Sequence, residues 1–69
     1  MKRSEILRVE KYLREKFGNT MITLSEQQDG SCEVNLDDEF IGIIFRDDED
    51  GEVSYDFHMA ILEMDLEPV

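Results

Sequence analysis

Apolar residues recur at helical spacing along residues 4–17, and the spacing changes after that segment. Four of them share one stripe of a helix: Ile6, Val9, Leu13 and Phe17. Such a stripe is typical of an amphipathic helix whose apolar side packs into a core. Ser4 can cap the first turn, and Gly18 can adopt the left-handed conformation that ends many helices. The pattern therefore predicts a helix over residues 4–17.

From residue 20 onward, apolar residues alternate with polar ones or form short continuous runs. Four segments have these patterns, which are typical of β-strands: residues 20–26, 31–37, 40–46 and 52–61. Residues 62–67 fit either an extension of the last strand or one helical turn. We expect residues 1–69 to form a single α+β domain, with the N-terminal helix packed on an antiparallel meander sheet of three or four strands.

The strand register can be predicted from the alternation. A two-residue loop at Asp38 and Glu39 would pair three apolar residues with three others: Leu36, Val34 and Cys32 with Ile41, Ile43 and Phe45. The next loop should then have an odd length and Gly51 at positive φ, because an even loop would place Asp56 and His58 against that apolar face. The helix should cover these six residues together with Tyr55 and Phe57.

The opposite face of this predicted sheet is mixed, and no second helix is available to cover it. It would carry four small or apolar residues, namely Phe40, Gly42, Ile44 and Ala60, beside Glu33, Asn35, Asp56 and His58. Exposed apolar patches commonly mark contact surfaces. We therefore interpret four residues as candidates for binding a partner: Phe40, Ile44, His58 and Ala60.

Composition allows a core but a small one. The chain is 41% hydrophobic and 36% charged, and a chain of this length buries only a modest share of its surface. Cys32 is the single cysteine, so no disulfide can form within the chain, and its position in a strand predicts a small buried hydrophobe. With no signal peptide and no apolar run long enough to cross a membrane, we expect a cytoplasmic protein in a reducing compartment.

Charge divides the chain into two unequal parts. Residues 1–17 hold six basic and three acidic residues, net +3, whereas residues 18–69 hold Arg46 alone against fifteen carboxylates, net −14. The total of −11 argues against binding to nucleic acid or anionic membranes, and it favours protein partners with a basic surface. Mimicry of nucleic-acid charge is a further hypothesis that this balance allows.

Two segments carry a resemblance to a known family: YLREKFGN at 12–19 and DDEFIGIIFRDDEDGEVSYDFHMAIL at 37–62. They resemble a family of short, uncharacterised alphaproteobacterial proteins, the domain of unknown function 3126. The resemblance implies a bacterial, soluble, single-domain protein. It supplies no activity, ligand or catalytic residue that could be transferred to this chain.

The acidic run at residues 47–52 is the one segment that invites a metal interpretation. Its candidate ligands are Asp47, Asp48, Asp50 and Glu52. If Gly51 is aligned with the invariant glycine of an EF-hand loop, the first and twelfth positions become Arg46 and Phe57, which cannot supply the required carboxylates. We therefore assign no metal and no cofactor, and we keep a weak metal- or ligand-responsive loop as the alternative function.

Catalytic residues are not predicted. His58 is the single histidine and shares a strand face with Asp56, but no activated nucleophile accompanies them. The leading hypothesis is a small acidic interaction module, not an enzyme, that associates with itself or binds a partner protein through the open sheet face.

Overall fold

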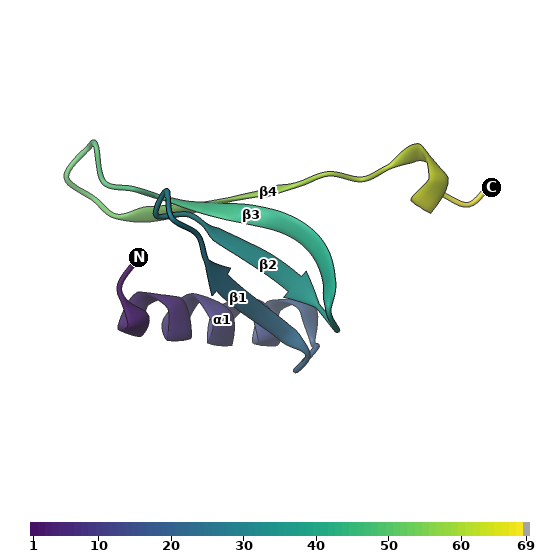
Figure 1. The fold of residues 1–69 in the computed structure, drawn as a ribbon, viewed down its shortest axis with the longest axis horizontal. Coiled ribbons are helices and arrows are strands. Elements are labelled where there is room, and N and C mark those ends of the chain that lie inside the picture. The colour runs from purple at the N-terminus through teal and green to yellow at the C-terminus, as the bar shows by residue number, and fades with distance from the viewer. Residues whose placement is uncertain (69) are drawn as a thin grey trace.

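The computed structural model describes residues 1–68, and it has one helix against one face of a four-stranded sheet (Figure 1). The elements are α1 (Arg3–Phe17), β1 (Ile22–Glu26), β2 (Cys32–Leu36), β3 (Glu39–Asp47), β4 (Ser54–Met59) and the 3-10 turn η1 (Glu63–Asp65). The strands are antiparallel and follow one another in the order β1-β2-β3-β4, so the sheet is an open meander. The predicted α+β fold is confirmed.

The ends of α1 follow from local hydrogen bonds. The Lys2 backbone N–H donates a hydrogen bond to Glu5 Oε1 at 3.0 Å. The side chain that accepts from the backbone at the start of the helix is therefore that of Glu5 and not that of Ser4. Gly18 ends it with φ 62° and ψ 34°, and its N–H donates to the Arg14 carbonyl oxygen, as the sequence predicted. None of the helices in the described part of the chain, residues 1–68, has the length and apolar character needed to cross a membrane.

Side chains of α1 hold the free edge of β1. Arg14 Nε donates to the Ile22 carbonyl oxygen at 2.8 Å, and the Leu24 backbone N–H donates to Glu10 Oε2 at 3.0 Å. Glu10 and Arg14 also form an ion pair across one helical turn, with 3.1 Å between Oε1 and Nη2. The helix is therefore anchored at the β1 side of the sheet, with β3 and β4 further away.

The turn between β2 and β3 lies one residue earlier than predicted. Asp37 and Asp38 both have positive φ, 51° and 69°, and Leu36 pairs with Glu39 across them. Aspartate tolerates this left-handed conformation better than most residues, and two such residues in succession form the tight turn that suits a twisted hairpin. The predicted loop at Asp38 and Glu39 is therefore wrong.

A bulge then reverses the faces of β3. Asn35 pairs with Phe40 but Val34 pairs with Gly42, so Ile41 is an extra residue in β3. As a result Cys32 lies opposite Ile44 rather than Phe45. The prediction that Ile43 and Phe45 line the helix-facing side was wrong, because after the bulge Gly42 and Ile44 take that side. Ile41, at the bulge itself, does pack against the core cluster as predicted.

The loop between β3 and β4 has a length that matches the reversed faces of β3. Asp47 pairs with Ser54, which leaves the six residues 48–53 in the loop, so the predicted odd length is wrong. Gly51 does have positive φ, 82°, as expected. The even loop sets Ile44 opposite Phe57 on the helix-facing side and Phe45 opposite Asp56 on the other side.

The core lies between α1 and the middle of the sheet. Its most buried side chains are at most 1% exposed: Ile22, Cys32, Val34 and Ile44. Leu13 brings α1 into the same cluster, and Ile6 is also buried. Burial of Cys32 agrees with the sequence analysis, and it raises the pKa of the thiol. Because Ile44 belongs to the core, the prediction that placed this partner-binding candidate on the open sheet face was wrong.

The chain after β4 leaves the body of the molecule. Residues 60–68, here called the C-terminal tail, continue in the direction of β4 beyond the end of α1 (Figure 1), and all of them are exposed. They contribute to a long dimension of 43 Å against 24 and 23 Å for the other two. The open question about residues 62–67 resolves as a single 3-10 turn, η1, between extended residues Leu62 and Leu66.

Candidate functional site

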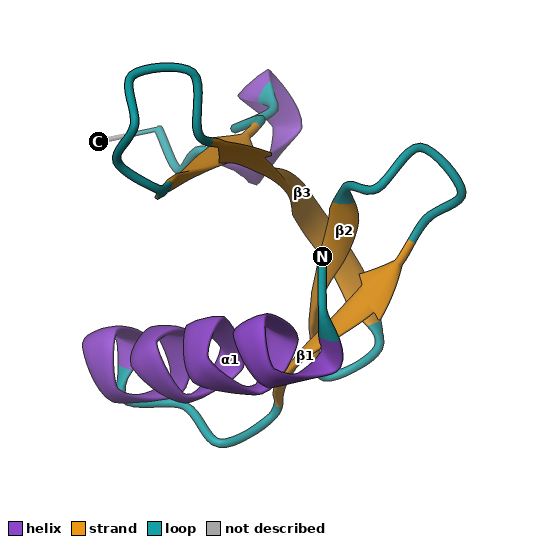
Figure 2. Ribbon diagram, turned by 90° about the vertical axis from the view of Figure 1, so that its left-hand side faces the viewer, coloured by secondary structure: helices purple, strands orange, loops and turns teal. Residues whose placement is uncertain are grey.

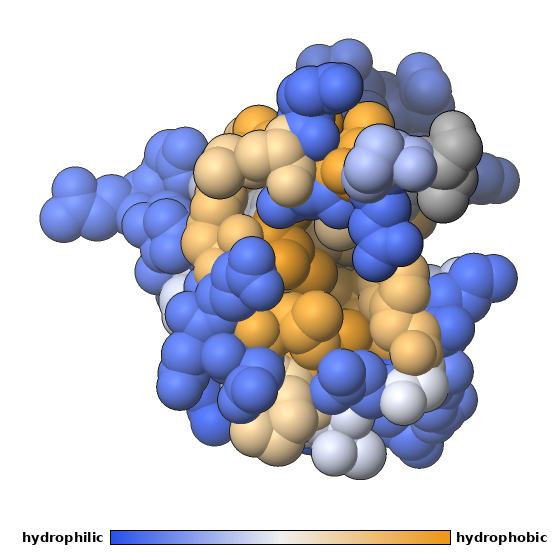
Figure 3. All heavy atoms as spheres, turned by 90° about the vertical axis from the view of Figure 1, so that its right-hand side faces the viewer, coloured by the Kyte–Doolittle hydropathy of each residue, from blue (hydrophilic) through white to orange (hydrophobic). Residues whose placement is uncertain are grey.

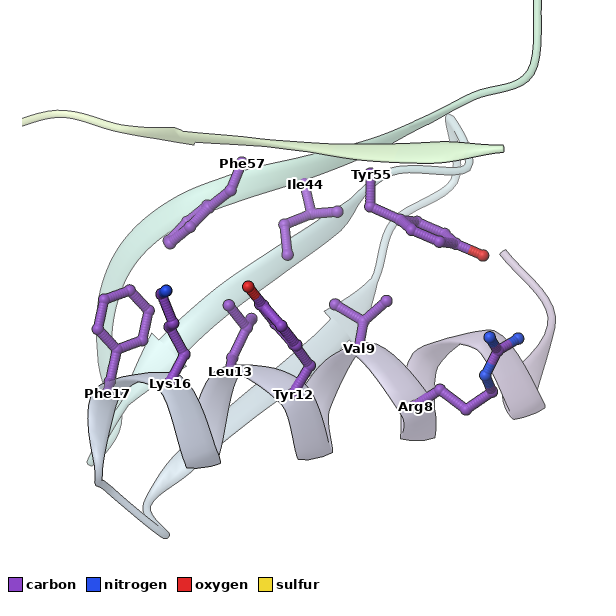
Figure 4. Close-up of a pocket in the computed structure, with 9 residues that line it drawn as sticks. All are labelled: Arg8, Val9, Tyr12, Leu13, Lys16, Phe17, Ile44, Tyr55 and Phe57. Carbon is purple, nitrogen blue, oxygen red and sulfur yellow. The ribbon is translucent and has the colours of Figure 1, made fainter. Parts of the chain in front are cut away.

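An apolar groove lies between α1 and the far half of the sheet. The sheet curves away from the helix as it passes from β1 to β4 (Figure 2), and the space holds a groove of about 550 Å³. Its lining comes from α1, β3 and β4 (Figure 4): Arg8, Val9, Tyr12, Leu13, Lys16, Phe17, Ile44, Tyr55 and Phe57. We call this space the helix groove.

The helix groove has an apolar floor and a basic rim. Leu13 and Ile44 form the floor, and Phe17 meets Phe57 edge to face at one end, with ring centroids 6.5 Å apart. Arg8 and Lys16 lie one helical turn on either side of Tyr12, so one side of the groove carries two cations. Neither cation forms an ion pair within residues 1–68.

A hydrogen-bonded cluster joins β3 and β4 to the start of α1. Glu5 Oε2 accepts hydrogen bonds from the Tyr55 hydroxyl and from Arg46 Nε, both at 2.6 Å. The Tyr55 hydroxyl, the Lys2 backbone amide and the Arg46 guanidinium together lower the pKa of Glu5 from its ordinary 4.5 to about 2. We call Glu5, Arg46 and Tyr55 the Glu5 latch.

The Glu5 latch should make stability depend on pH, and Glu5→Gln should remove that dependence. Because the pKa of Glu5 is lower in the folded protein, its contribution is fully present above about pH 4.5 and is lost as the pH falls towards 2. We expect Glu5→Gln to lower the melting temperature at neutral pH and to approach the wild type in acid. Thermal melting followed by circular dichroism from pH 7 to 2 measures both curves.

Glu15→Gln is the matched control for this experiment. Glu15 is also on α1, is exposed, and makes no hydrogen bond or ion pair with its side chain in the part of the chain that the structure describes. Its curve should run parallel to that of the wild type. If the Glu5→Gln and wild-type curves also run parallel, the latch does not contribute to stability.

A second hollow, here called the tail hollow, lies beside β3, β4 and the C-terminal tail. Its volume is about 1200 Å³, and it contains three of the four sequence-predicted partner-binding residues: Phe40, His58 and Ala60. Phe40 is 54% exposed and Ile61 66% exposed. Figure 3 looks at the end of the molecule from which the tail extends and shows apolar residues gathered in a hollow with hydrophilic surface around it.

His58 lies in the tail hollow as an exposed side chain. Its ring meets Phe45 edge to face, with centroids 5.4 Å apart. Asp56 is on the same strand face, but the two side chains form no ion pair in the described residues. The exposed position predicted for His58 is confirmed.

The acidic loop has local roles in the turn. Asp47 Oδ1 accepts a hydrogen bond from the Glu49 backbone N–H at 3.0 Å, and Asp48 pairs with Arg46 at 2.8 Å. No group of three or more histidine, cysteine, aspartate or glutamate side chains in residues 1–68 is arranged to hold a metal ion. The candidates Asp50 and Glu52 are exposed and add no ligand geometry.

Sequence reasoning did not predict the helix groove, because it assigned the whole apolar stripe of the helix to the core. Phe17, the last residue of that stripe, is 53% exposed, and Tyr12 beside it is 61% exposed. The signal that was available is the line of Arg8, Tyr12 and Lys16, since a basic and aromatic row at helical spacing borders the stripe.

Comparison with known proteins gives a family and no activity. A family model described as "Protein of unknown function (DUF3126)" matches residues 5–65, which include nearly all of α1, the whole sheet and η1. No curated protein and no solved structure matches the chain. Both apolar surfaces lie within the matched region.

Proposed function

Because the chain belongs to this DUF3126 family, whose description gives no activity, we propose a function from its surfaces: it is a non-catalytic interaction module that associates with a second copy of itself. The contact would involve the surface around the ends of β3 and β4 and the C-terminal tail. The observation that supports this is the exposure of large apolar residues there, each more than half accessible: Phe40, Met59, Ile61, Leu62, Met64 and Leu66. Contiguous apolar patches of this kind usually mark interfaces.

A second copy is the partner that needs the fewest assumptions. Most soluble oligomers are symmetric assemblies of one chain, and an isologous contact lets the same patch cover itself. The short domain would also gain buried apolar area that its own core does not supply. Binding of a different protein with a basic surface is the other occupant that the net charge of −11 would favour.

The titratable side chains are consistent with a binding rather than a chemical role. Cys32 is fully buried with a raised pKa, so its thiol stays protonated and inaccessible at neutral pH. The carboxylate of Glu5 accepts hydrogen bonds within the Glu5 latch, and Asp29 Oδ1 accepts hydrogen bonds from both the backbone N–H and the hydroxyl of Ser31. These contacts stabilise the fold and leave no activated nucleophile among them.

The mass of the protein in solution tests the proposal. Light scattering after size-exclusion chromatography should give twice the mass of one chain at about 0.15 M salt, and also at about 1 M salt, where charge interactions are strongly screened. Phe40→Asp should shift the protein towards the monomer, because it places a carboxylate in the apolar contact. A wild type that is monomeric at both salt concentrations would contradict self-association.

Thr23→Asp is the matched control for the interface variant. Thr23, Asn35 and Phe40 lie in one row across β1, β2 and β3, so Thr23 is on the same face as Phe40 but two strands away. The two variants carry the same added charge, and both sites are exposed. If both variants dissociate equally, net charge rather than the apolar contact controls assembly.

A further inference from the structure

We propose that the helix groove of each copy binds the C-terminal tail of a second copy, so that two copies exchange tails in a symmetric dimer. This inference rests on the proposed self-association: the C-terminal tail is part of the contact proposed there, and the helix groove is the surface of the other copy that receives it. It assigns a role to two features that have no partner within residues 1–68. These features are the basic rim of the groove and the apolar, acidic tail.

The tail has the chemical character of a docking segment. Apolar residues alternate with acids from residue 62 to residue 67: Leu62, Glu63, Met64, Asp65, Leu66 and Glu67. Met64 is 84% exposed, which is extreme for a large apolar side chain. One 3-10 turn, held by backbone hydrogen bonds from Asp65 to Leu62 and from Leu66 to Glu63, is the only regular structure in the described part of the tail.

The helix groove offers the complementary surface. Its apolar floor can receive the side chains of Leu62, Met64 or Leu66, and its rim carries Arg8 and Lys16. Residues 1–17 are the only net-basic part of a chain whose remaining residues are net −14. An acidic, apolar segment therefore finds matching charge in the helix groove and repulsion over most of the remaining surface.

The dimensions agree with this pairing. Arg8 and Lys16 are eight residues apart on α1, which is about 12 Å along the helix axis. The six residues 62–67 reach about 20 Å when extended, so one tail can place a carboxylate near each cation.

The direction of the tail favours a second copy over the tail's own groove. It continues from β4 past the end of α1 (Figure 1), so that returning to its own groove would require a reversal of the chain directly after Met59. In a dimer with a two-fold axis, each tail fills the partner's groove and both grooves are occupied, which closes the assembly. The exchange therefore also explains why association would stop at two copies.

Charge exchange between groove and tail tests the proposal in the full chain. Arg8→Glu combined with Lys16→Glu should weaken the dimer about tenfold or more, because two attractive contacts become repulsive. Adding Glu63→Lys and Asp65→Lys to that variant should restore most of the affinity. Arg3→Glu combined with Lys11→Glu is the control, since it changes the net charge equally on exposed helix positions outside the groove. The dissociation constants can be measured by analytical ultracentrifugation.

A disulfide experiment identifies the copy that supplies the tail. Equal amounts of Tyr12→Cys protein and isotope-labelled Leu62→Cys protein are mixed and oxidised, and mass spectrometry should find a cross-link between the labelled and unlabelled chains. Cys32 is buried, and Lys11→Cys in place of Tyr12→Cys serves as the control outside the groove. A chain carrying both replacements that forms the disulfide within itself as a monomer would overturn the exchange.

The outcomes separate this inference from the proposed function. A dimeric wild type whose affinity falls equally in the groove variant and in its control would overturn tail exchange while self-association stands. A monomeric wild type would overturn both. Recovery of the dimer by the compensating tail charges is the result that supports exchange, because a structural defect in α1 would not be repaired by substitutions in the tail.

Discussion

Replacing Ile44 by aspartate should abolish cooperative folding, whereas the same replacement at its neighbour Phe45 should leave a folded protein. Ile44 is 1% exposed and shares the core cluster with Leu13, Ile22 and Val34. Loss of its side chain alone costs about 2–5 kcal/mol in a packed core, and an unpaired buried carboxylate adds several more. A domain of this size has a total stability of roughly 3–10 kcal/mol. The cost of Ile44→Asp is therefore equal to most or all of the free energy of unfolding.

Phe45 provides the matched position because it is adjacent in sequence and lies on the opposite face. It is 42% exposed and its main aromatic contact is His58, so an aspartate there remains solvated. We expect a native-like circular dichroism spectrum and a cooperative melt for Phe45→Asp, with neither for Ile44→Asp. Ile44→Val should cost only about 1 kcal/mol and shows whether the site tolerates an apolar change.

This comparison tests the reversal of β3 directly. Without the bulge at Ile41, the core residue would have been Phe45, and the two variants would exchange their behaviour. A folded Ile44→Asp protein and an unfolded Phe45→Asp protein would show that the bulge at Ile41 is absent. If both fold equally well, β3 does not form the centre of the core.

The sequence predicted the elements well because their periodicities are strong. A helical stripe ends at Gly18, and alternating segments are separated by turn residues, so the helix and all four strands lie within a few residues of their expected positions. Register was harder to predict for a specific reason. The run FIGIIFR has apolar side chains at both odd and even positions, so either face of β3 satisfied the hydrophobic pattern.

Two local features decided the register, and neither has a strong sequence signal. Asp37 and Asp38 adopt positive φ although neither is glycine, and Ile41 forms the bulge without any residue that marks it. The reversed face of β3 also affected the prediction of the partner-binding residues. Phe40, His58 and Ala60 remained exposed as expected, but Ile44 moved to the core with the reversed face.

The helix groove could not be predicted from periodicity, because periodicity reports which side of an element is apolar and not how far two layers separate. The separation here depends on the curvature of the sheet and on where α1 is anchored. Glu10 and Arg14 tie α1 to β1, and the Glu5 latch holds β3 and β4 only near the start of the helix. The groove remains in the stretch between these attachments.

The second large effect is expected from Gly42→Ala, in the same strand. Gly42 is buried and pairs with Met59, and a Cβ at this position would lie within 3.0 Å of the Phe57 ring and of the His58 carbonyl oxygen. The ring could move, but the carbonyl belongs to the backbone of β4 and can move only with that strand. Overpacking of this kind costs about 1–3 kcal/mol or more. In a domain of this size that lowers the melting temperature by about 4–8 °C for each kcal/mol.

Two comparisons show whether the clash with β4 is the cause. Gly30→Ala is strained by its φ of 88° but meets no atom within 4 Å, so it should lower the melting temperature by less than Gly42→Ala does. Adding Phe57→Leu to Gly42→Ala should restore little, because the backbone oxygen remains in place. A Gly42→Ala protein that melts with the wild type would mean that β4 is not seated over Gly42. The helix groove would then lose the wall that Phe57 supplies, and tail exchange would lose its binding site.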